Sequence, residues 1–383
     1  MKTIYCDHNA TTTLHNHVSD AMITLIKKNM PYNSSSIHKY GQEAKNIIEE
    51  ARKYIKKSFG AISYNDNKNI SVIFCATGTE ANNLALKGKN WKEIIISSIE
   101  HSSVAKCRKD SIILNVDSDG IVNINQLEEI LYNIYNNIEK NEKFLVSISL
   151  ANGEIGIIQK IQTIAKLTHK YNGVIHTDAS QAFGKIPVNF FDLGVDMMTI
   201  SGHKFGGPIG SAALVLQNSI SLYPIIDGGG QEMGMRSGTL NIISIHGLGV
   251  ACSIINEINN NWSNVELQRN KLEDLFNIDK KNLLHKPINS EIKRLPNTIS
   301  VRIPGIKSDV QVAYFDRYNI CVSSGPACSS GTIKKTSSVY LSLGYENTAS
   351  EEFIRISLGP GISNEDLYKI NDVWQSLKNK YVK

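Results

Sequence analysis

The chain has 383 residues, of which 41% are hydrophobic and 20% are charged, and its formal net charge is only +5. This is the composition of a globular protein long enough for two domains, and its lysines are interleaved with Asp, Glu and Asn, which argues against a nucleic-acid partner. No run approaches the roughly 18 apolar residues of a membrane span, and the N-terminus lacks the apolar stretch of a signal peptide, so we expect no membrane partner.

The cysteines are scattered and form no C-x-x-C pair. They occupy positions 6, 75, 107, 252, 321 and 328. A disulfide framework is not expected in a protein of this size, so the pattern predicts free thiols in a reducing cytoplasm. A cysteine with a functional role would then act through the reactivity of its thiol.

Helical and strand patterns alternate between residues 16 and 255, which we assign to a large domain. Helical periodicity at 18–26 and 47–55 comes first. The β-rich runs that follow lie at residues 71–76, 93–98, 144–151, 173–179, 196–202 and 211–217. Most are separated by a helical stretch, which predicts an α/β fold with a mostly parallel sheet covered on both faces. Ligands in such sheets bind beyond the carboxyl ends of the strands.

The pattern changes from about residue 256, where it becomes typical of a smaller α+β domain. A helical stretch at 265–276 and a helix near 308–317 are expected. Short β-rich runs lie at residues 297–303, 319–324 and 353–359. The chain ends in an amphipathic helix, whose apolar face carries Leu367, Ile370, Val373, Trp374 and Leu377.

Polar residues follow several of the predicted strands. Gly78 and Thr79 open a helix after a strand, where free N–H groups and a hydroxyl can bind a phosphate. For this segment alone, a simple helix cap is the favoured explanation. His101 stands at another helix start, where a histidine is more often a capping residue than a catalyst. Asn152 ends a further strand, and a loop-forming role is its plain explanation.

A lysine and an aspartate indicate that these polar residues belong to one site. Asp178 ends an apolar strand, where a carboxylate is costly unless it is paired with a cation. Lys204 follows 26 residues later in the segment SGHKFGGP, at the end of the next strand, so both side chains are expected at one edge of the sheet. A lysine that reacts with a carbonyl, an aspartate and a helix N-terminus that binds an anion together indicate a pyridoxal-phosphate site.

Ten segments, in this order along the chain, resemble the NifS/IscS-type cysteine desulfurases, which are class V enzymes of the fold-type I family of pyridoxal-phosphate-dependent transferases. They are DHNATT (7–12), NSSSIHKYG (33–41), TGTEANNLA (77–85), EHSSV (100–104), NGEIGIIQ (152–159), HTDASQAFGK (176–185), SGHKFGGPIG (201–210), GGGQEMGMRSGT (228–239), SSGPACSSG (323–331) and IRISLG (354–359). The resemblance implies a homodimer, and a small domain that joins residues 1–15 to 256–383.

The resemblance also implies roles for single residues. Lys204 would be the Schiff-base lysine, Asp178 the partner of the pyridine nitrogen and Gln181 the partner of the phenolic oxygen. His101 would stack on the ring and move protons. The cofactor-binding residues would be Gly78, Thr79, His101, Asn152, Asp178, Gln181, Ser201, His203, Lys204 and Thr239.

Among these residues, Thr79, Ser201 and His203 would bind the phosphate, and Thr239 would reach across from the second subunit. Asn9, Asn152 and Arg355 would bind the substrate, the last two through its carboxylate, which suits a bidentate guanidinium.

Cys328 would take the sulfur of L-cysteine, leaving L-alanine, and pass it as a persulfide to an acceptor for iron–sulfur cluster assembly or thiolation. Its surroundings of small residues suit a loop that carries a thiolate to the substrate and away again.

Two other classes of function stay open on the sequence alone. One is a selenocysteine lyase or another aminotransferase-like member of class V. The other is a non-catalytic adaptor of a sulfur pathway that keeps the fold.

The chain also departs from the usual family pattern at several places. His8 stands where asparagine is usual, Ala76-Thr77 where Ser-Gly is usual, and Gly153 where a second asparagine is usual. Ile209 and Pro326 replace a lysine and a serine. We expect these departures to affect the rate and the choice of acceptor and not the reaction, since each proposed ionisable group is present.

The sequence predicts no metal site. Residues 115–126 match the EF-hand loop at some positions, but Asn115 and Gln126 stand where charged ligands belong, and the flanks have strand character. A β-turn is the expected structure there.

Overall fold

A computed structural model describes residues 2–60, 70–276, 284–325 and 337–381. Its largest sheet has seven strands in the order β2-β8-β7-β6-β5-β3-β4. These strands are β2 (Ile70–Cys75), β3 (Ile94–Ser97), β4 (Ile112–Leu114), β5 (Leu145–Ser147), β6 (Val174–Asp178), β7 (Met197–Ser201) and β8 (Ala212–Gln217). The pairings of β8 with β2 and β7 are antiparallel and the other pairings of this sheet are parallel, so the predicted mostly parallel α/β fold is confirmed.

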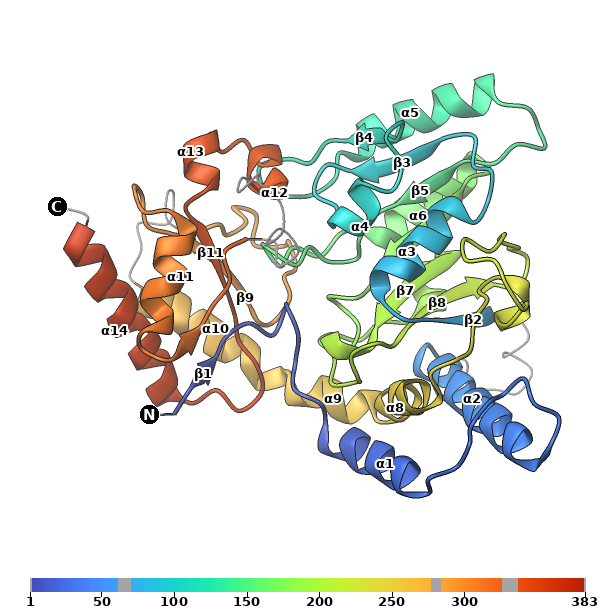
Figure 1. The fold of residues 1–383 in the computed structure, drawn as a ribbon. Coiled ribbons are helices and arrows are strands. Elements are labelled where there is room, and N and C mark those ends of the chain that lie inside the picture. The colour runs from blue at the N-terminus through green and yellow to red at the C-terminus, as the bar shows by residue number, and fades with distance from the viewer. Residues whose placement is uncertain (1, 61–69, 277–283, 326–336, 382–383) are drawn as a thin grey trace.

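Helices cover both faces of the seven-stranded sheet (Figure 1). They are α1 (Asn16–Lys27), α2 (Lys39–Ser58), α3 (Gly78–Lys87), α4 (Ser102–Ala105), α5 (Ile124–Asn137), α6 (Ile161–Lys170), α7 (Phe190–Leu193) and α8 (Ile242–Ser253). Successive strand residues belong to different apolar clusters. Met197 is in the cluster that includes residues of α3 and α4, whereas Met198 is in the cluster that includes residues of α2, α6 and α8. This alternation follows from the two-residue period of a strand and explains why the strands are apolar throughout.

Two short sheets form the other part of the molecule, in which the two ends of the chain meet. Strand β1 (Ile4–Tyr5) pairs in parallel with β10 (Ile320–Cys321), and β9 (Thr298–Arg302) pairs antiparallel to β11 (Phe353–Ser357). The helices of this part are α9 (Ile255–Asn261), α10 (Ser263–Leu275), α11 (Ser308–Asp316), α12 (Ser338–Ser342), α13 (Asn347–Ser350) and α14 (Asn364–Tyr381). Figure 1 shows β1 and α14 in the same half, beside β9 and β11. The exact residue limits of the two domains stay a prediction.

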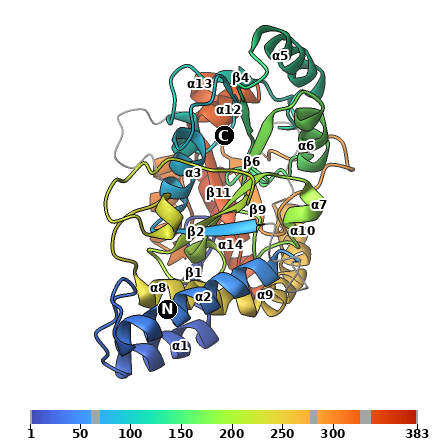
Figure 2. The ribbon, with the colours of Figure 1, turned by 90° about the vertical axis from the view of Figure 1, so that its right-hand side faces the viewer.

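Helix α8 lies on the border of the two parts. It packs against α1 and α2, and the three helices lie together at the lower edge of the molecule in both Figure 1 and Figure 2. Among the residues that the structure describes, no single helix is long and apolar enough to cross a bilayer. Helices Ile242–Ser253 and Ile255–Leu275 meet the length and composition requirement only as a pair, which is bent by 67°.

Candidate active site

Lys204 ends the short 3₁₀ turn Gly202–Lys204, which directly follows β7. Its Nζ donates hydrogen bonds to the carbonyl oxygens of Asn9, at 2.6 Å, and Ala10, at 2.9 Å. The Nε2 of Gln181 donates to the same Asn9 oxygen at 3.0 Å. The predicted lysine and glutamine therefore meet on one acceptor, which the N-terminal segment supplies.

Asp178 ends β6, which pairs in parallel with β7, so its carboxylate lies at the same edge of the sheet as the turn that carries Lys204. It is only 9% exposed. The backbone N–H of Ser180 donates to Oδ1 at 2.9 Å, and the side-chain amide of Asn82 in α3 donates to Oδ2 at 2.7 Å. Two hydrogen bonds therefore orient a nearly buried carboxylate.

Asn82 also connects Asp178 to His101. Its Nδ2 donates to Ser103 Oγ at 2.8 Å, and that hydroxyl lies 2.7 Å from His101 Nδ1. The backbone N–H of Ser103 donates to the same ring nitrogen at 3.2 Å, so Nδ1 accepts and a neutral His101 ring carries its proton on Nε2. His101 begins α4 as its N-cap, as expected for a histidine at a helix start.

The N-terminus of α3 forms a candidate anion site with Ser180 and Ser201. Thr77 caps this helix by accepting the Glu80 N–H at 3.1 Å. A Cβ at Gly78 would lie 3.3 Å from Ser180 Oγ and 3.4 Å from Ser201 Cβ, so only a glycine leaves space there. Ser180 Oγ is buried and has no hydrogen-bond partner among the described residues. Because buried hydroxyl groups are nearly always hydrogen-bonded, this one is suited to bind a ligand.

His203 lies beside this candidate anion site, between Ser201 and Lys204 in the chain. Its Nδ1 is 3.2 Å from Thr11 Oγ1. Burial, together with the charges of Lys204 and Lys185, lowers its pKa to about 4. The ring is therefore neutral at pH 7 and acts there through hydrogen bonds rather than through charge.

Arg355 lies inside β11 and is 3% exposed, so it is a buried arginine and not an edge residue at the surface. Its Nη2 donates to Asp7 Oδ1 at 2.7 Å and its Nη1 to the Gly153 carbonyl at 3.2 Å. The Nε atom is buried and has no partner among the described residues. The backbone of Arg355 also exchanges two hydrogen bonds with Ser323, which lies five residues before Cys328.

Asn9 joins several parts of the site through its side-chain amide. Its Oδ1 accepts from Lys185 Nζ at 2.6 Å and from Asn297 Nδ2 at 2.9 Å, while its Nδ2 donates to Thr298 Oγ1 and to the Gly153 carbonyl. Each polar atom of this amide thus contacts the protein itself. A direct contact of Asn9 with the substrate stays a prediction.

Lys185 is a second lysine of the site, which the sequence analysis did not single out. It is 2% exposed, and its Nζ donates to Asn9 Oδ1 and, at 2.9 Å, to Gln181 Oε1. Burial holds its pKa well below the usual range, and the charges of Lys204 and Arg355 act in the same direction. Because Gln181 Oε1 accepts from Lys185, Gln181 presents its Nε2 donor on the side of Lys204.

Two buried carboxyl groups support the segments around His101 and Asn152. Glu100 accepts hydrogen bonds from Ser97 Oγ and from the N–H and hydroxyl of Ser149, and burial raises its pKa to about 7. It thereby joins the ends of β3 and β5. Asn152 caps its own loop, since its Oδ1 accepts from the N–H groups of the next residues and its Nδ2 donates to the Ile99 carbonyl.

Glu154 is the second of these carboxyl groups, and it lies beside both residues that flank positions 326–336. Its Oε2 accepts from Ser337 Oγ at 2.7 Å and lies 3.9 Å from the position of a Cβ on Gly325. Burial raises its pKa, and the Ser337 hydrogen bond opposes this shift. Cys328 and Pro326 themselves lie outside the described residues.

The segment that carries Thr239 is joined to the N-terminus of α3. Arg236 Nε donates to Glu80 Oε1 at 2.6 Å, and Glu80 Oε2 accepts the Ala76 N–H at 2.8 Å. Thr239 itself is exposed.

Three of the departures from the family pattern have a structural explanation. His8 is 7% exposed and packs edge-on to Tyr5, and it lies where a Cβ on Gly359 would be only 2.0 Å from its Nε2. Thr77 is the α3 cap. Gly153 leaves room for Gln181, because a Cβ there would lie 3.0 Å from Gln181 Nε2. Ile209 is exposed, and nothing in the structure explains its choice.

Sequence reasoning missed the partners of the predicted residues. These are Asn82, Ser103, Ser180, Lys185, Asp7, Glu100 and Glu154. The signals for two of them were present, since Asn82 follows Thr79 by three residues on one helix face and Lys185 follows Gln181 by four.

The fold and the lysine at a strand end define a class of enzyme. The family described as aminotransferase class-V matches residues 4–369, so the chain belongs to that family. Within it the chain is 35% identical to the cysteine desulfurase IscS of Dictyoglomus turgidum, over 98% of this chain and 95% of the relative. It is also 32% identical to the cysteine desulfurase IscS of Methanosarcina thermophila, over 99% and 93%. The predicted resemblance to the NifS/IscS-type proteins is thereby confirmed.

Solved structures agree with this assignment. A NifS-like protein from Rickettsia africae superposes with a TM-score of 0.88 at 34% identity, covering 99% of this chain and 100% of that one. A structure described as SspA in complex with cysteine superposes with a TM-score of 0.74 at 28% identity, covering 94% and 99%. The predicted fold type of the class V enzymes is therefore confirmed over almost the whole chain.

Proposed function

We propose that this protein is a cysteine desulfurase, which uses pyridoxal phosphate to remove sulfur from L-cysteine. The observation that carries the proposal is the meeting of Lys204 and Gln181 on one backbone oxygen, at the sheet edge where Asp178 is anchored. The curated relatives named cysteine desulfurase support it, as does the related structure described as a complex with cysteine.

The residues present fit a phosphorylated pyridine cofactor. The space at Gly78, the buried Ser180 hydroxyl without a partner and the N–H groups at the start of α3 suit a phosphate. Ser201 and the neutral His203 adjoin this position, and Asp178 would hold a proton on the ring nitrogen. When bound, pyridoxal phosphate supplies an aldehyde that reacts with amines and a ring that withdraws electrons from the substrate α-carbon.

The chain's own groups would perform the binding and proton-transfer steps. Lys204 would supply the amine that the substrate displaces and would then move the α-proton, with His101 Nε2 as a second proton donor. Arg355, oriented by Asp7, would bind the substrate carboxylate through its guanidinium. Gln181, oriented by Lys185, would donate to the phenolic oxygen.

Cys328 would receive the sulfur. The carbon–sulfur bond of L-cysteine breaks and a sulfur–sulfur bond forms on Cys328, so that L-alanine and a protein persulfide are the products. The Cys328 S–H bond also breaks and a C–H bond forms on the carbon that becomes the alanine methyl group. The two electrons that the sulfur atoms lose go to that carbon, so no external oxidant or reductant is needed. An acceptor protein of iron–sulfur cluster assembly or thiolation would then take the sulfur.

A visible spectrum of the purified protein, recorded with and without L-cysteine and combined with an alanine assay, tests the proposal. We expect a yellow protein whose absorbance changes on addition of L-cysteine and which forms alanine. Cys328→Ser should keep the absorbance and lose sulfide release, whereas Lys204→Ala should lose alanine formation. A colourless protein would support a non-catalytic adaptor instead.

A selenocysteine lyase or another aminotransferase-like enzyme is the second candidate, and parallel assays with L-cysteine and L-selenocysteine separate the two. Turnover of L-cysteine by Cys328→Ser at the rate of the unmodified protein would exclude the persulfide route. If the protein is a desulfurase, Cys328→Ser should retain less than about one tenth of the activity with L-cysteine. A tenfold loss corresponds to an increase of about 1.4 kcal/mol in the activation free energy.

We further propose a homodimer in which Thr239 of one subunit reaches the cofactor of the other. Its exposed position supports this, as do exposed apolar side chains such as Ile37, Tyr223 and Met233, because such residues favour association. Light scattering of the purified protein tests it. We also propose the reducing cytoplasm as its location, since the five cysteines that the structure describes carry free thiols.

A further inference from the structure

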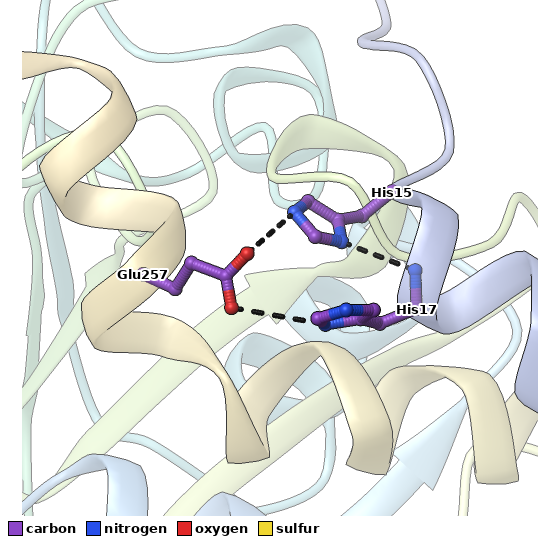
Figure 3. Close-up of side chains that lie close together, drawn as sticks. All are labelled: His15, His17 and Glu257. Carbon is purple, nitrogen blue, oxygen red and sulfur yellow. Dashed lines mark hydrogen bonds and ion pairs between the residues drawn. The ribbon is translucent and has the colours of Figure 1, made fainter.

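Two histidines and a glutamate gather where the two parts of the molecule are joined, away from the site described above. His15 and His17 lie at the beginning of α1, and Glu257 lies in α9. Figure 3 shows the Glu257 carboxylate pointing between the two imidazole rings. One carboxylate oxygen is 3.5 Å from His15 Nε2 and the other is 3.7 Å from His17 Nδ1.

The distances from the two histidines to the Glu257 oxygens are long for hydrogen bonds and near the spacing of ligand atoms around one metal ion. Both distances exceed the usual hydrogen-bond range of about 2.7–3.2 Å. Zinc bonds to nitrogen and oxygen of about 2.0–2.1 Å, in tetrahedral geometry, place neighbouring ligand atoms about 3.3–3.4 Å apart. One ligand atom from each of the three residues lies within 4.8 Å of the other two, so small side-chain rotations bring them onto one ion.

The local backbone orients the His15 ring so that one of its nitrogen atoms can bind a metal ion. His15 is the N-cap of α1, and its Nδ1 faces the backbone N–H of His17 at 3.4 Å, which leaves Nε2 directed at Glu257. Its side chain is 21% exposed, while those of His17 and Glu257 are 61% and 49% exposed. An ion at this place therefore has access to solvent, and water can supply the remaining ligand.

The ligand types select the class of metal. Two imidazoles and one carboxylate suit late first-row divalent cations such as Zn²⁺, whereas Mg²⁺ and Ca²⁺ prefer sites made of oxygen atoms alone. We propose that His15, His17 and Glu257 form a surface site for a divalent cation of the zinc class, which connects α1 to α9.

The segments that supply these ligands also contact the active site. The His15 N–H donates to the Gly206 carbonyl at 2.9 Å, two residues beyond Lys204. Trp262 follows α9, and its ring lies 5.8 Å from Lys185 Nζ. A metal ion bound between α1 and α9 would therefore stabilise the relative position of the two segments that contact the neighbourhoods of Lys204 and Lys185. The binding of the ion depends only on the three named ligands and not on the proposed function.

Zinc titration of the full-length, metal-free protein in competition with a chromogenic chelator tests the site. His17→Gln and Glu257→Gln change exposed side chains, so both variants should fold. Loss of a residue that only supports a ligand typically weakens metal binding about 10–100-fold. Loss of a direct ligand should weaken zinc binding at this site by at least as much. Mg²⁺ should not compete with zinc.

His38→Gln is the control. Like His15, His38 is a helix N-cap whose Nδ1 faces a backbone N–H, here that of Gly41. It should bind as much zinc as the unmodified protein. Because thiols also bind zinc, anomalous diffraction from zinc-soaked crystals should locate the ion, and we expect a peak between His15, His17 and Glu257. Zinc found only at cysteines, or a titration that is identical for His17→Gln and His38→Gln, would overturn the proposal.

Discussion

Asn82 donates a hydrogen bond of 2.7 Å to the carboxylate of Asp178. The two residues are 96 positions apart, and the same amide group also donates to Ser103, which holds His101. One asparagine on α3 thus sets the orientation of both the proposed partner of the ring nitrogen and the proposed proton-moving histidine. It is a positioning residue, since it acts through Asp178 and His101.

Replacement of Asn82 by leucine should therefore impair turnover without loss of the fold. A hydrogen bond to a charged group contributes about 1.5–3 kcal/mol, so we expect kcat for alanine formation to fall about 10–150-fold. The absorbance maximum of the bound cofactor should shift as well, because Asp178 would lose one of its two donors. A purely structural role would not move that maximum.

The neighbouring Asn83 offers a control for this variant. Its Nδ2 donates to the Thr79 carbonyl at 2.9 Å and, at 3.4 Å, to the Ser103 carbonyl, and not to the Asp178 carboxylate or the Ser103 hydroxyl. Asn83→Leu should keep both the absorbance maximum and kcat. If Asn82→Leu and Asn83→Leu behaved alike, the proposed link between Asn82 and Asp178 would have no role in the reaction.

Asp7 should affect substrate binding through Arg355. The Asp7 carboxylate accepts from Arg355 Nη2 at 2.7 Å and so fixes the plane of the guanidinium. Arg355→Lys loses the bidentate geometry, and we expect KM for L-cysteine to rise about 10-fold or more. Asp7→Asn should raise KM less and leave kcat nearly unchanged. Alanine formation measured against L-cysteine concentration gives both constants, and a change confined to kcat would contradict this role of Asp7.

Gly153 should be required by the present position of Gln181. A Cβ at residue 153 would lie 3.0 Å from Gln181 Nε2. That nitrogen donates to the Asn9 carbonyl, while Oε1 of the same amide accepts from Lys185. Gly153→Asn introduces the residue more usual in the resembling family and should displace the Gln181 amide. We expect an altered cofactor spectrum and weaker cofactor retention on dialysis. Gly305→Asn is the control: no described atom lies within 4 Å of its Cβ, and asparagine tolerates the positive φ of +80° there better than most residues do, so the spectrum should be unchanged. An unchanged spectrum in Gly153→Asn would show that the Gln181 amide accommodates the larger side chain, which would contradict this prediction.

The protein should lose stability in mild acid because of its buried histidines. Burial lowers the pKa of His8, His176 and His285 to about 4. Since the unfolded chain binds protons with a pKa of about 6.5, it takes up more protons than the native state as the pH falls from about 6.5 to about 4. Each of these histidines should therefore reduce the free energy of unfolding by about 2 kcal/mol between pH 7 and pH 5.

His285→Phe isolates one of these contributions. His285 is 4% exposed, and its Nε2 has no hydrogen-bond partner among the described residues, so phenylalanine removes both the titration and an unsatisfied polar atom. The variant should be at least as stable as the unmodified protein at pH 7 and should lose about 2 kcal/mol less on going to pH 5. Urea unfolding at both pH values measures this, and parallel losses in the two proteins would contradict the assignment.

Much of the site was predictable because the fold repeats one simple rule. The carboxyl ends of parallel strands lie at one edge, so Asp178 after β6 and Lys204 after β7 had to be neighbours once the strands were recognised. The helix starts at Gly78 and His101 also follow from local pattern, since capping depends on residues close in sequence.

The partners of these residues were not predictable in the same way. Lys185 has an ordinary sequence setting, yet the structure buries it against Asn9, which lies 176 residues away. The pairing of Arg355 with Asp7 spans 348 residues. No local pattern encodes such contacts, because they depend on how the two chain ends pack together.

The amino-acid sequence by itself determined the alternation of strands and helices and the reactive groups at the strand ends, since both depend on short-range periodicity. Only the tertiary structure decided which distant side chains orient those groups, which of them are buried and neutral, and that His15 and His17 face Glu257 across the junction of α1 and α9. The physical reason is that burial and pairing are properties of the packed chain, and packing joins residues whose separation in sequence carries no signal.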